Sequence, residues 1–366
     1  MINANLGGAV LKHPRSSNLE LYRIVCMLMI VAHHYVVNSG VMAATGPIGE
    51  NPHAANSLFM MLFGAWGKTG INCFLMITGY FMCTGKITIR KFIKLMGQIY
   101  LYKLCIYSLL LVAGYETLSV VRLVKVLMPT WDIRDNFIGC FIWFWLSIPF
   151  LNVMVQNMNK RQHELLLILL LFIYTLLGSI PSFIVTFNYV TWFGVVYFVA
   201  SYIRMYPIPI FNNTKLWGYL TLVSVLLTIV SVYLFNYQYV SDSNKIFAVV
   251  VAVCSFLWFK NLKIRYSRLI NTFGAATFGV LLIHANSNAM RQWLWKDTVD
   301  VIGHYHTLTT GELVLFSIGV VLAVFIICNL IDQFRIATVE KWFFNWYDNK
   351  VSAKADALVN KILQKQ

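Results

Sequence analysis

One segment that is apolar enough to span a membrane carries four ionisable side chains. It covers residues 18–34 and contains Glu20, Arg23, His33 and His34. A charged group at bilayer depth costs at least about 2.5 kcal/mol, so an intramembrane ionisable residue indicates a functional site by default. The segment therefore predicts a membrane helix whose polar face takes part in the function of the protein.

The composition places the whole chain among integral membrane proteins. Only 12% of its 366 residues are charged and 59% are hydrophobic, whereas roughly a quarter of the residues in soluble proteins carry a charge. Apolar stretches reach the roughly 20 residues that a helix needs to cross the hydrocarbon core. We therefore expect an all-α, polytopic membrane helix bundle with about ten transmembrane helices. They are predicted near 19–38, 58–83, 92–113, 137–156, 164–181, 188–204, 216–236, 244–260, 273–290 and 311–332.

The basic residues predict the orientation of this bundle. Alternate loops and the two ends hold 20 of the 29 Lys and Arg residues, and short loops rich in these residues stay in the cytoplasm. Both termini are therefore predicted to be cytoplasmic. The net charge of +15 does not indicate nucleic acid, because the cations form no basic face. We divide the chain into a cytoplasmic N-terminal segment (1–18), a transmembrane domain (19–332) and an amphipathic, basic cytoplasmic tail (333–366).

The seven cysteines predict neither a disulfide framework nor a metal site. All of them lie in or beside apolar stretches, their number is odd, and no two stand in CxxC spacing. We expect no structural zinc and no tightly bound cofactor.

Helical geometry separates the polar residues of the first predicted span. Arg23 and His34 are eleven residues apart, which at about 100° per residue places them on one face, roughly 16 Å from each other. Glu20 lies one turn before Arg23 and can pair with its guanidinium group, whereas His33 points roughly 80° away. Such a face suits a polar path through the bundle. Alternatively, Arg23 and His34 mark the two membrane edges and extend into the headgroups.

The second predicted span is longer than one membrane thickness and is rich in glycine. We expect a break there, or a tilted pair of half-helices. At this break, Lys68 and Asn72 either line a pore or cap a half-helix. The glycines are Gly64, Gly67, Gly70 and Gly79.

Two motifs in the first two spans resemble those of a known family. Glu20 and Arg23, followed by His34 eleven residues after the arginine, match the first-span pattern of the membrane acyltransferase-3 family. The second span reads GKTGINCFLMITGYF and is similar to that family's Gly-Val-x-x-Phe-Phe-x-x-Ser-Gly-Phe pattern. Tyr80 is in register with this pattern, and Thr78 replaces the usual Ser.

Three further segments follow in the order of the same family. The loop after the second span normally carries Arg-x-x-Arg, and Lys91-x-x-Lys94 after Arg90 looks like a lysine variant, which changes the fork geometry of the cations. Residues 143–146 (WFWL) are similar to the family's Trp-Phe-Leu segment. The sequence TFGVLLIH, which ends at His284, resembles its Thr-Phe-x-x-Tyr-Leu-x-His pattern.

The resemblance runs from about residue 16 to 332 and implies an enzyme that acylates carbohydrates with acyl-CoA. It implies His34 as the general base or as a transient acyl acceptor. Arg23, oriented by Glu20, would hold a pantetheine carbonyl or stabilise the developing oxyanion.

The resemblance also suggests where the substrates bind. Arg90, Lys91 and Lys94 would bind the phosphates of the acyl-CoA co-substrate, or they are ordinary charges of a cytoplasmic loop. Trp143 and Trp145 either stack on a sugar or anchor the helix in the membrane interface. His284 is a structural hydrogen-bonding residue or a second catalyst. The candidates for the pore or the substrate site are Lys68, Asn72, Tyr80, Trp143, Trp145 and His284.

We therefore expect an O-acetyltransferase of the bacterial cell membrane. It would move an acetyl group from acetyl-CoA to a hydroxyl of a surface or exported polysaccharide, or of its lipid-linked precursor. Two outer segments, 43–56 and 115–136, could cover the groove for this carbohydrate acceptor. An alternative is a transporter or flippase of lipid-linked oligosaccharide, because the chain has many spans, a broken helix and intramembrane charges. The sequence leaves open which sugar, hydroxyl and acyl chain are involved.

Overall fold

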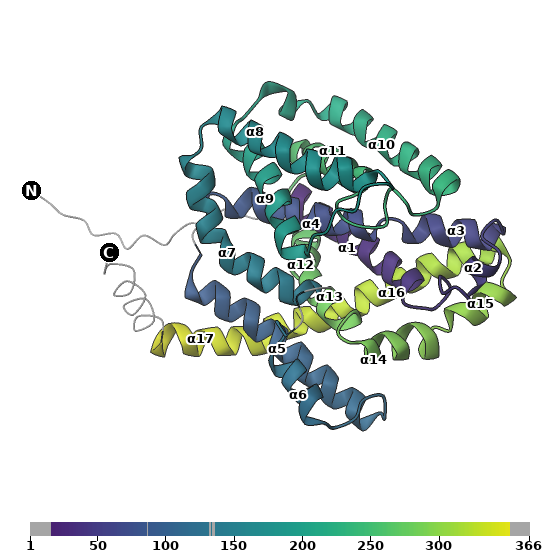
Figure 1. The fold of residues 1–366 in the computed structure, drawn as a ribbon. Coiled ribbons are helices and arrows are strands. Elements are labelled where there is room, and N and C mark those ends of the chain that lie inside the picture. Colours follow the sequence, from purple (N-terminus) through teal and green to yellow (C-terminus); the bar gives the residue numbers. More distant parts are fainter. Residues whose placement is uncertain (1–15, 86, 132, 134–135, 352–366) are drawn as a thin grey trace, which may run out of the picture.

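The structure is a computed structural model that describes residues 16–351 except 86, 132 and 134–135. The described chain is all-helical and has no strand (Figure 1). The α-helices are α1 (Ser17–Val37), α2 (Pro47–Glu50), α3 (Ala55–Gly64), α4 (Gly67–Met82), α5 (Ile89–Val112), α6 (Val120–Leu127), α7 (Phe137–Asn157), α8 (Lys160–Leu171), α9 (Tyr189–Met205), α10 (Thr214–Phe235), α11 (Ile246–Asn261), α12 (Arg268–Ala275), α13 (Thr277–His284), α14 (Asn288–Arg291), α15 (Val301–Thr307), α16 (Thr310–Arg335) and α17 (Lys341–Lys350). The π-helical turns are η1 (Phe172–Leu177), η3 (Gln292–Thr298) and η4 (Ile336–Glu340), and η2 (Pro209–Asn212) is a 3₁₀ turn.

Six helical segments of the described chain are long and apolar enough to cross a membrane. They are α1, α3 with α4, α5, α7, α10, and α16 with η4 and α17. The other predicted spans correspond to shorter helices (α8 with η1, α9 and α11) and to a bent helix pair. The count of ten and the cytoplasmic termini stay predictions. The predicted end segments, 1–18 and 333–366, lie partly outside the described residues.

The predicted break in the second span is confirmed. Helix α3 ends at Gly64 and α4 begins at Gly67. A Cβ atom at Gly67 would lie 2.1 Å from His33 Cγ, and one at Gly70 would lie 2.9 Å from the Cys26 carbonyl oxygen. Small residues let membrane helices approach this closely. The glycines therefore allow α4 to pack directly against α1.

The span predicted at 273–290 is not one straight helix. Helices α12 and α13 together (Arg268–His284) and the following Asn288–Thr307 segment meet at 95°. The polar residues Asn286 and Ser287 interrupt the apolar pattern, and Ser287 caps the N-terminus of α14 by accepting a hydrogen bond from the Met290 amide. The average hydropathy over 273–290 is still apolar, so it does not reveal the turn. The turn places His284 at the C-terminal end of a buried half-helix.

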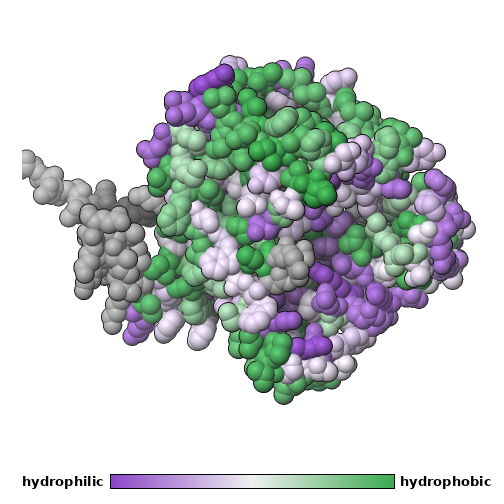
Figure 2. Space-filling model, in the orientation of Figure 1, coloured by the Kyte–Doolittle hydropathy of each residue, from purple (hydrophilic) through white to green (hydrophobic). Residues whose placement is uncertain are grey.

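Helix α1 lies at the centre of the bundle. It contacts α3, α4, α11, α12, α13 and α16, so helices pack against α1 on several of its sides (Figure 1). On the face drawn in Figure 2, apolar residues cover much of the surface, whereas polar residues gather around a hollow to the right of the centre. An apolar exterior suits a lipid environment, and the helices enclose apolar clusters of buried side chains around the polar cavity. The fold thus positions the ionisable side chains of α1 inside the protein.

Candidate active site

The predicted pairing of Glu20 with Arg23 is present. Arg23 Nη1 lies 3.1 Å from Glu20 Oε1, and Glu20 is buried. The rise of the helix separates Arg23 from His34 by roughly 16 Å along α1. An oxyanion donor must lie about 3 Å from the oxygen that it stabilises. Arg23 is therefore too distant to stabilise an oxyanion that forms at His34, and pantetheine binding by Arg23 stays a prediction.

His34 is the last member of a chain of hydrogen bonds that begins at the Val280 carbonyl oxygen and passes through His284. We call this chain the His34 relay. His284 Nδ1 lies 2.6 Å from the Val280 carbonyl oxygen, and His284 Nε2 lies 2.9 Å from His34 Nδ1. A carbonyl oxygen only accepts, so His284 Nδ1 carries the hydrogen, and a neutral ring then presents Nε2 as an acceptor. His34 Nδ1 consequently donates to His284. The lone pair of His34 is left on Nε2, which is the form that a general base requires.

The neighbouring His33 is held in a different way. Its Nδ1 donates to the Gly64 carbonyl oxygen at 2.7 Å, which joins α1 to the end of α3. The same ring packs against Gly67. These contacts assign His33 to the α1–α4 junction and agree with its predicted direction away from the Arg23 and His34 face.

A cavity of about 1190 Å³ opens beside His34. Described residues of the 115–136 segment line part of it, whereas no residue of 43–56 does, and coverage of a carbohydrate groove stays a prediction. Among the lining side chains of the described chain, five are Lys or Arg and one is Glu. The polar lining residues include His33, His34, Asn38, Lys68, Lys103, Tyr107, Tyr115, Glu116, Arg122, Lys125, Asn136, Tyr189, Asn286, Ser287, Asn288, Arg291 and Gln292.

Two candidates at the start of α4 have different surroundings. Lys68 lines the cavity, and its Nζ lies 2.5 Å from the Tyr189 hydroxyl and 3.3 Å from Asp242 Oδ1. Asn72 is buried and donates to the carbonyl oxygen of Ser243 at 2.7 Å, while its own Oδ1 accepts from Trp192. Asn72 therefore holds helices together, and it does not line the His34 cavity.

The aromatic candidates lie away from the cavity beside His34. Tyr80 accepts a hydrogen bond from Arg204 at 3.1 Å, and the guanidinium group also lies over its ring. Trp145 is buried and stacks on Phe92, whereas Trp143 is exposed on the surface of α7. Exposure on an apolar helix surface favours the anchoring interpretation of Trp143.

The predicted phosphate-binding cations Arg90 and Lys94 form ion pairs within the protein. Arg90 forms two hydrogen bonds of 2.9 Å with the Asp348 carboxylate, and Lys94 pairs with Glu340. These contacts tie α5 to η4 and α17. Lys91 lies between them on α5, and phosphate binding by this cluster stays a prediction.

Comparison with known protein families identifies the family of this chain. A family model described as an acyltransferase domain matches residues 16–331. The chain belongs to the acyltransferase-3 family. No curated protein and no solved structure shows significant similarity to it. The acyltransferase-3 match begins just before α1 and ends within α16, so it contains the His34 site. Together with the apolar helices it establishes a multi-pass membrane acyltransferase, and nothing in these findings favours the transporter interpretation.

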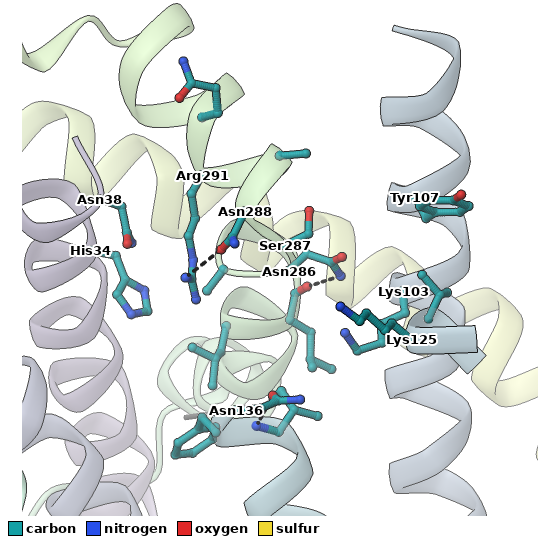
Figure 3. A pocket seen from close by; sticks show the side chains of 18 of the residues that line it. His34, Asn38, Lys103, Tyr107, Lys125, Asn136, Asn286, Ser287, Asn288 and Arg291 are labelled. Atoms are coloured by element: carbon teal, nitrogen blue, oxygen red, sulfur yellow. Dashed lines mark hydrogen bonds between the residues drawn. The ribbon is translucent and has the colours of Figure 1, made fainter. Parts of the chain in front are cut away.

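Three cations of this cavity are not among the candidates that the sequence suggests. Lys103, Lys125 and Arg291 all line the cavity (Figure 3). Lys103 lies inside the span predicted at 92–113, so the rule that singled out Arg23 would also have found it. Lys125 and Arg291 lie outside the predicted spans near them or at their polar edge, where single cations give no signal of a functional site. Their convergence depends on how α5, α6 and α14 are arranged, which spacing along the chain does not reveal.

A buried ionic cluster near the other end of the bundle was also overlooked. Asp332 is completely buried and accepts hydrogen bonds from Arg335 Nε at 2.7 Å and from the Tyr102 hydroxyl at 2.8 Å. A Cβ atom at Gly279 would lie 2.1 Å from Asp332 Cγ. Arg335 Nη1 also contacts Glu340 at 2.7 Å. This cluster links α5, α13 and α16, and sequence periodicity gave no signal for it.

The relay predicts a positioning role for His284. Replacing His284 with Phe leaves the buried His34 Nδ1 hydrogen without an acceptor, which costs about 1–3 kcal/mol. If the free energy of the reactive His34 tautomer rises by this amount, kcat falls by roughly 5- to 150-fold. We expect the KM for acyl-CoA to stay unchanged and His284→Gln to recover part of the rate, since its amide oxygen can accept from His34. Steady-state kinetics of the purified variants measures these effects. A His284→Gln variant that is as slow as His284→Phe would argue against the relay.

Proposed function

We propose that the protein is an O-acetyltransferase of the bacterial cell membrane. Its donor is acetyl-CoA, and its acceptor is a hydroxyl group of a surface or exported polysaccharide or of the lipid-linked precursor. The observation that carries the proposal is the oriented His34 ring, whose Nε2 is left unprotonated beside a large polar cavity. Acyltransferase-3 membership supports the reaction class.

His34 performs proton transfer in the proposed reaction. Nε2 removes the proton from the acceptor hydroxyl as its oxygen attacks the thioester carbonyl carbon. The tetrahedral intermediate collapses when the carbon–sulfur bond breaks, and the imidazolium of His34 returns the proton to the departing CoA thiolate. The products are the sugar ester and CoA-SH, so protons and electrons balance. His284 selects the His34 tautomer before the first transfer and keeps accepting the Nδ1 hydrogen while His34 is an imidazolium.

Arg291 supplies charge next to His34. Figure 3 shows its guanidinium group extending from α14 toward the space beside the His34 ring. Its Nη1 contacts Asn288 Oδ1 at 3.3 Å, and its buried Nε has no hydrogen-bond partner among the described residues. A donor in this place suits a developing oxyanion. Arg23 and Glu20, further along α1, are proposed to hold the pantetheine arm.

The test uses the full-length protein in liposomes with acetyl-CoA labelled in the acetyl group. We expect CoA-SH release together with labelled, alkali-labile ester on an added glycan, because the reaction forms an O-acyl bond. Translocation of a lipid-linked oligosaccharide without CoA release would contradict the proposal. Comparing NMR spectra of the surface glycan from cells with and without the protein would identify the acetylated hydroxyl.

A further inference from the structure

We propose that the acceptor carries a negatively charged group, a phosphate or a carboxylate, and that Lys103 and Lys125 bind it. This inference rests on the proposed acyl transfer at His34 and names the substrate class of that site. It starts from an excess of positive charge around the cavity that the transfer chemistry does not use.

Some of the cations that line the cavity have a carboxylate partner, and others do not form an ion pair in the described chain. Arg122 pairs with Glu116, and Lys68 shares Asp242 with Tyr189. Lys103 and Lys125 form no ion pair with a carboxylate in the described chain, although both line the cavity. An anionic ligand would supply the counter-charge that the described residues do not provide at this place.

Lys103 is the more informative of these two cations. It lies within α5, a helix long and apolar enough to cross the membrane, and its side chain is only partly exposed. Removing an ammonium group from water without a counter-charge is costly. Arg291 also lies close enough for its charge to oppose that of Lys103. Such an arrangement is unfavourable in an empty cavity and becomes favourable when an anion binds.

The two lysines reach one place from different helices. Lys103 comes from α5 and Lys125 from α6. Figure 3 shows their side chains converging beside Asn286, while Arg291 and His34 lie on the other side of that residue. The cavity of about 1190 Å³ exceeds the usual upper range of ligand pockets, roughly 1,000 Å³. It has room for a sugar at His34 and an attached or neighbouring charged group at the lysines.

The position along α5 distinguishes the acceptor from the donor. Lys103 lies nine residues after Lys94, which corresponds to about 14 Å along the helix. In the proposed orientation, Lys94 is at the cytoplasmic end, where acyl-CoA enters, and Lys103 is further outward. The anion at Lys103 and Lys125 therefore belongs to the acceptor and not to the phosphates of CoA.

The binding test compares three matched probes with the full-length protein in nanodiscs. The probes are methyl glucoside, methyl glucuronide and methyl glucoside 6-phosphate. Ligand-observed NMR measures the affinity of each probe. We expect at least tenfold tighter binding of the two acidic probes and loss of this preference in Lys103→Gln/Lys125→Gln. The control is Lys215→Gln/Lys263→Gln, which removes the same charge at two exposed sites outside the cavity and should keep the preference.

The kinetic test uses the same probes as acceptors with labelled acetyl-CoA. The double variant should raise the KM for the acidic acceptors at least tenfold and leave the KM for acetyl-CoA unchanged. A rise in the acetyl-CoA KM alone would assign the lysines to the donor and overturn the inference. Equal use of neutral and acidic acceptors by the unmodified protein would overturn it as well. Preferential binding of acidic probes without any acetyl transfer would refute the proposed function and leave the anion site standing.

Discussion

His34→Gln should remove most of the acetyl-transfer activity while the protein still inserts and folds. A positioned general base contributes about 10²- to 10⁴-fold to the rate, so kcat should fall by that factor. Glutamine keeps a side-chain amide that can donate to His284 Nε2, and the buried hydrogen bond therefore survives. The amide has no basic nitrogen, which removes only the proton acceptor. Labelled acetyl-CoA and purified protein in liposomes give the measurement.

The neighbouring residue offers a matched control for this variant. His33→Gln removes an imidazole one position earlier on α1, where the ring contacts the Gly64 carbonyl oxygen. We expect a loss of less than tenfold, about 1.4 kcal/mol at most. Retained transfer in His34→Gln, or an equal loss in both variants, would assign catalysis to another group.

Arg335→Leu should produce the largest loss of stability. Asp332 and Arg335 are buried and lie 2.7 Å apart, so removing the guanidinium group leaves a carboxylate without its counter-charge. Breaking a buried ion pair in this way costs about 3–5 kcal/mol. We expect a marked drop in the unfolding temperature in detergent and little folded protein, measured by fluorescence-detected gel filtration during a thermal ramp.

A second substitution separates charge from packing in this cluster. Asp332→Asn in the Arg335→Leu background removes the uncompensated charge while it keeps the shape of the side chain. The double variant should therefore be more stable than Arg335→Leu alone, although it is less stable than the natural protein. Equal stability of the single and double variants would mean that packing, and not buried charge, dominates here.

Local features could be predicted from the sequence because short-range geometry determines them. The pairing of Glu20 with Arg23 follows from one helical turn, and the break between α3 and α4 follows from the glycines and the excess length. His34 and His284 were both recognised as candidates. Their hydrogen bond joins residues 250 positions apart, and periodicity along one helix cannot reveal a contact between two helices.

The remaining features depend on tertiary arrangement. Loop charge predicts on which side Arg90 lies, but it does not identify Asp348 as the carboxylate that meets it. The 95° turn after His284 was missed because an apolar average over 273–290 conceals the polar residues within it. Lys103 was missed although the rule applied to Arg23 covers it. Convergence on one cavity becomes evident only when the helices are assembled.

The third member of the His34 relay is a main-chain atom, and this affects how the site tolerates mutation. The Val280 carbonyl oxygen is present whichever amino acid occupies that position, provided that α13 stays helical. Natural variants can therefore differ at position 280 without loss of the proton arrangement, while substitution of either imidazole disrupts it. Comparisons among relatives should find a constant histidine pair beside a freely varying third position.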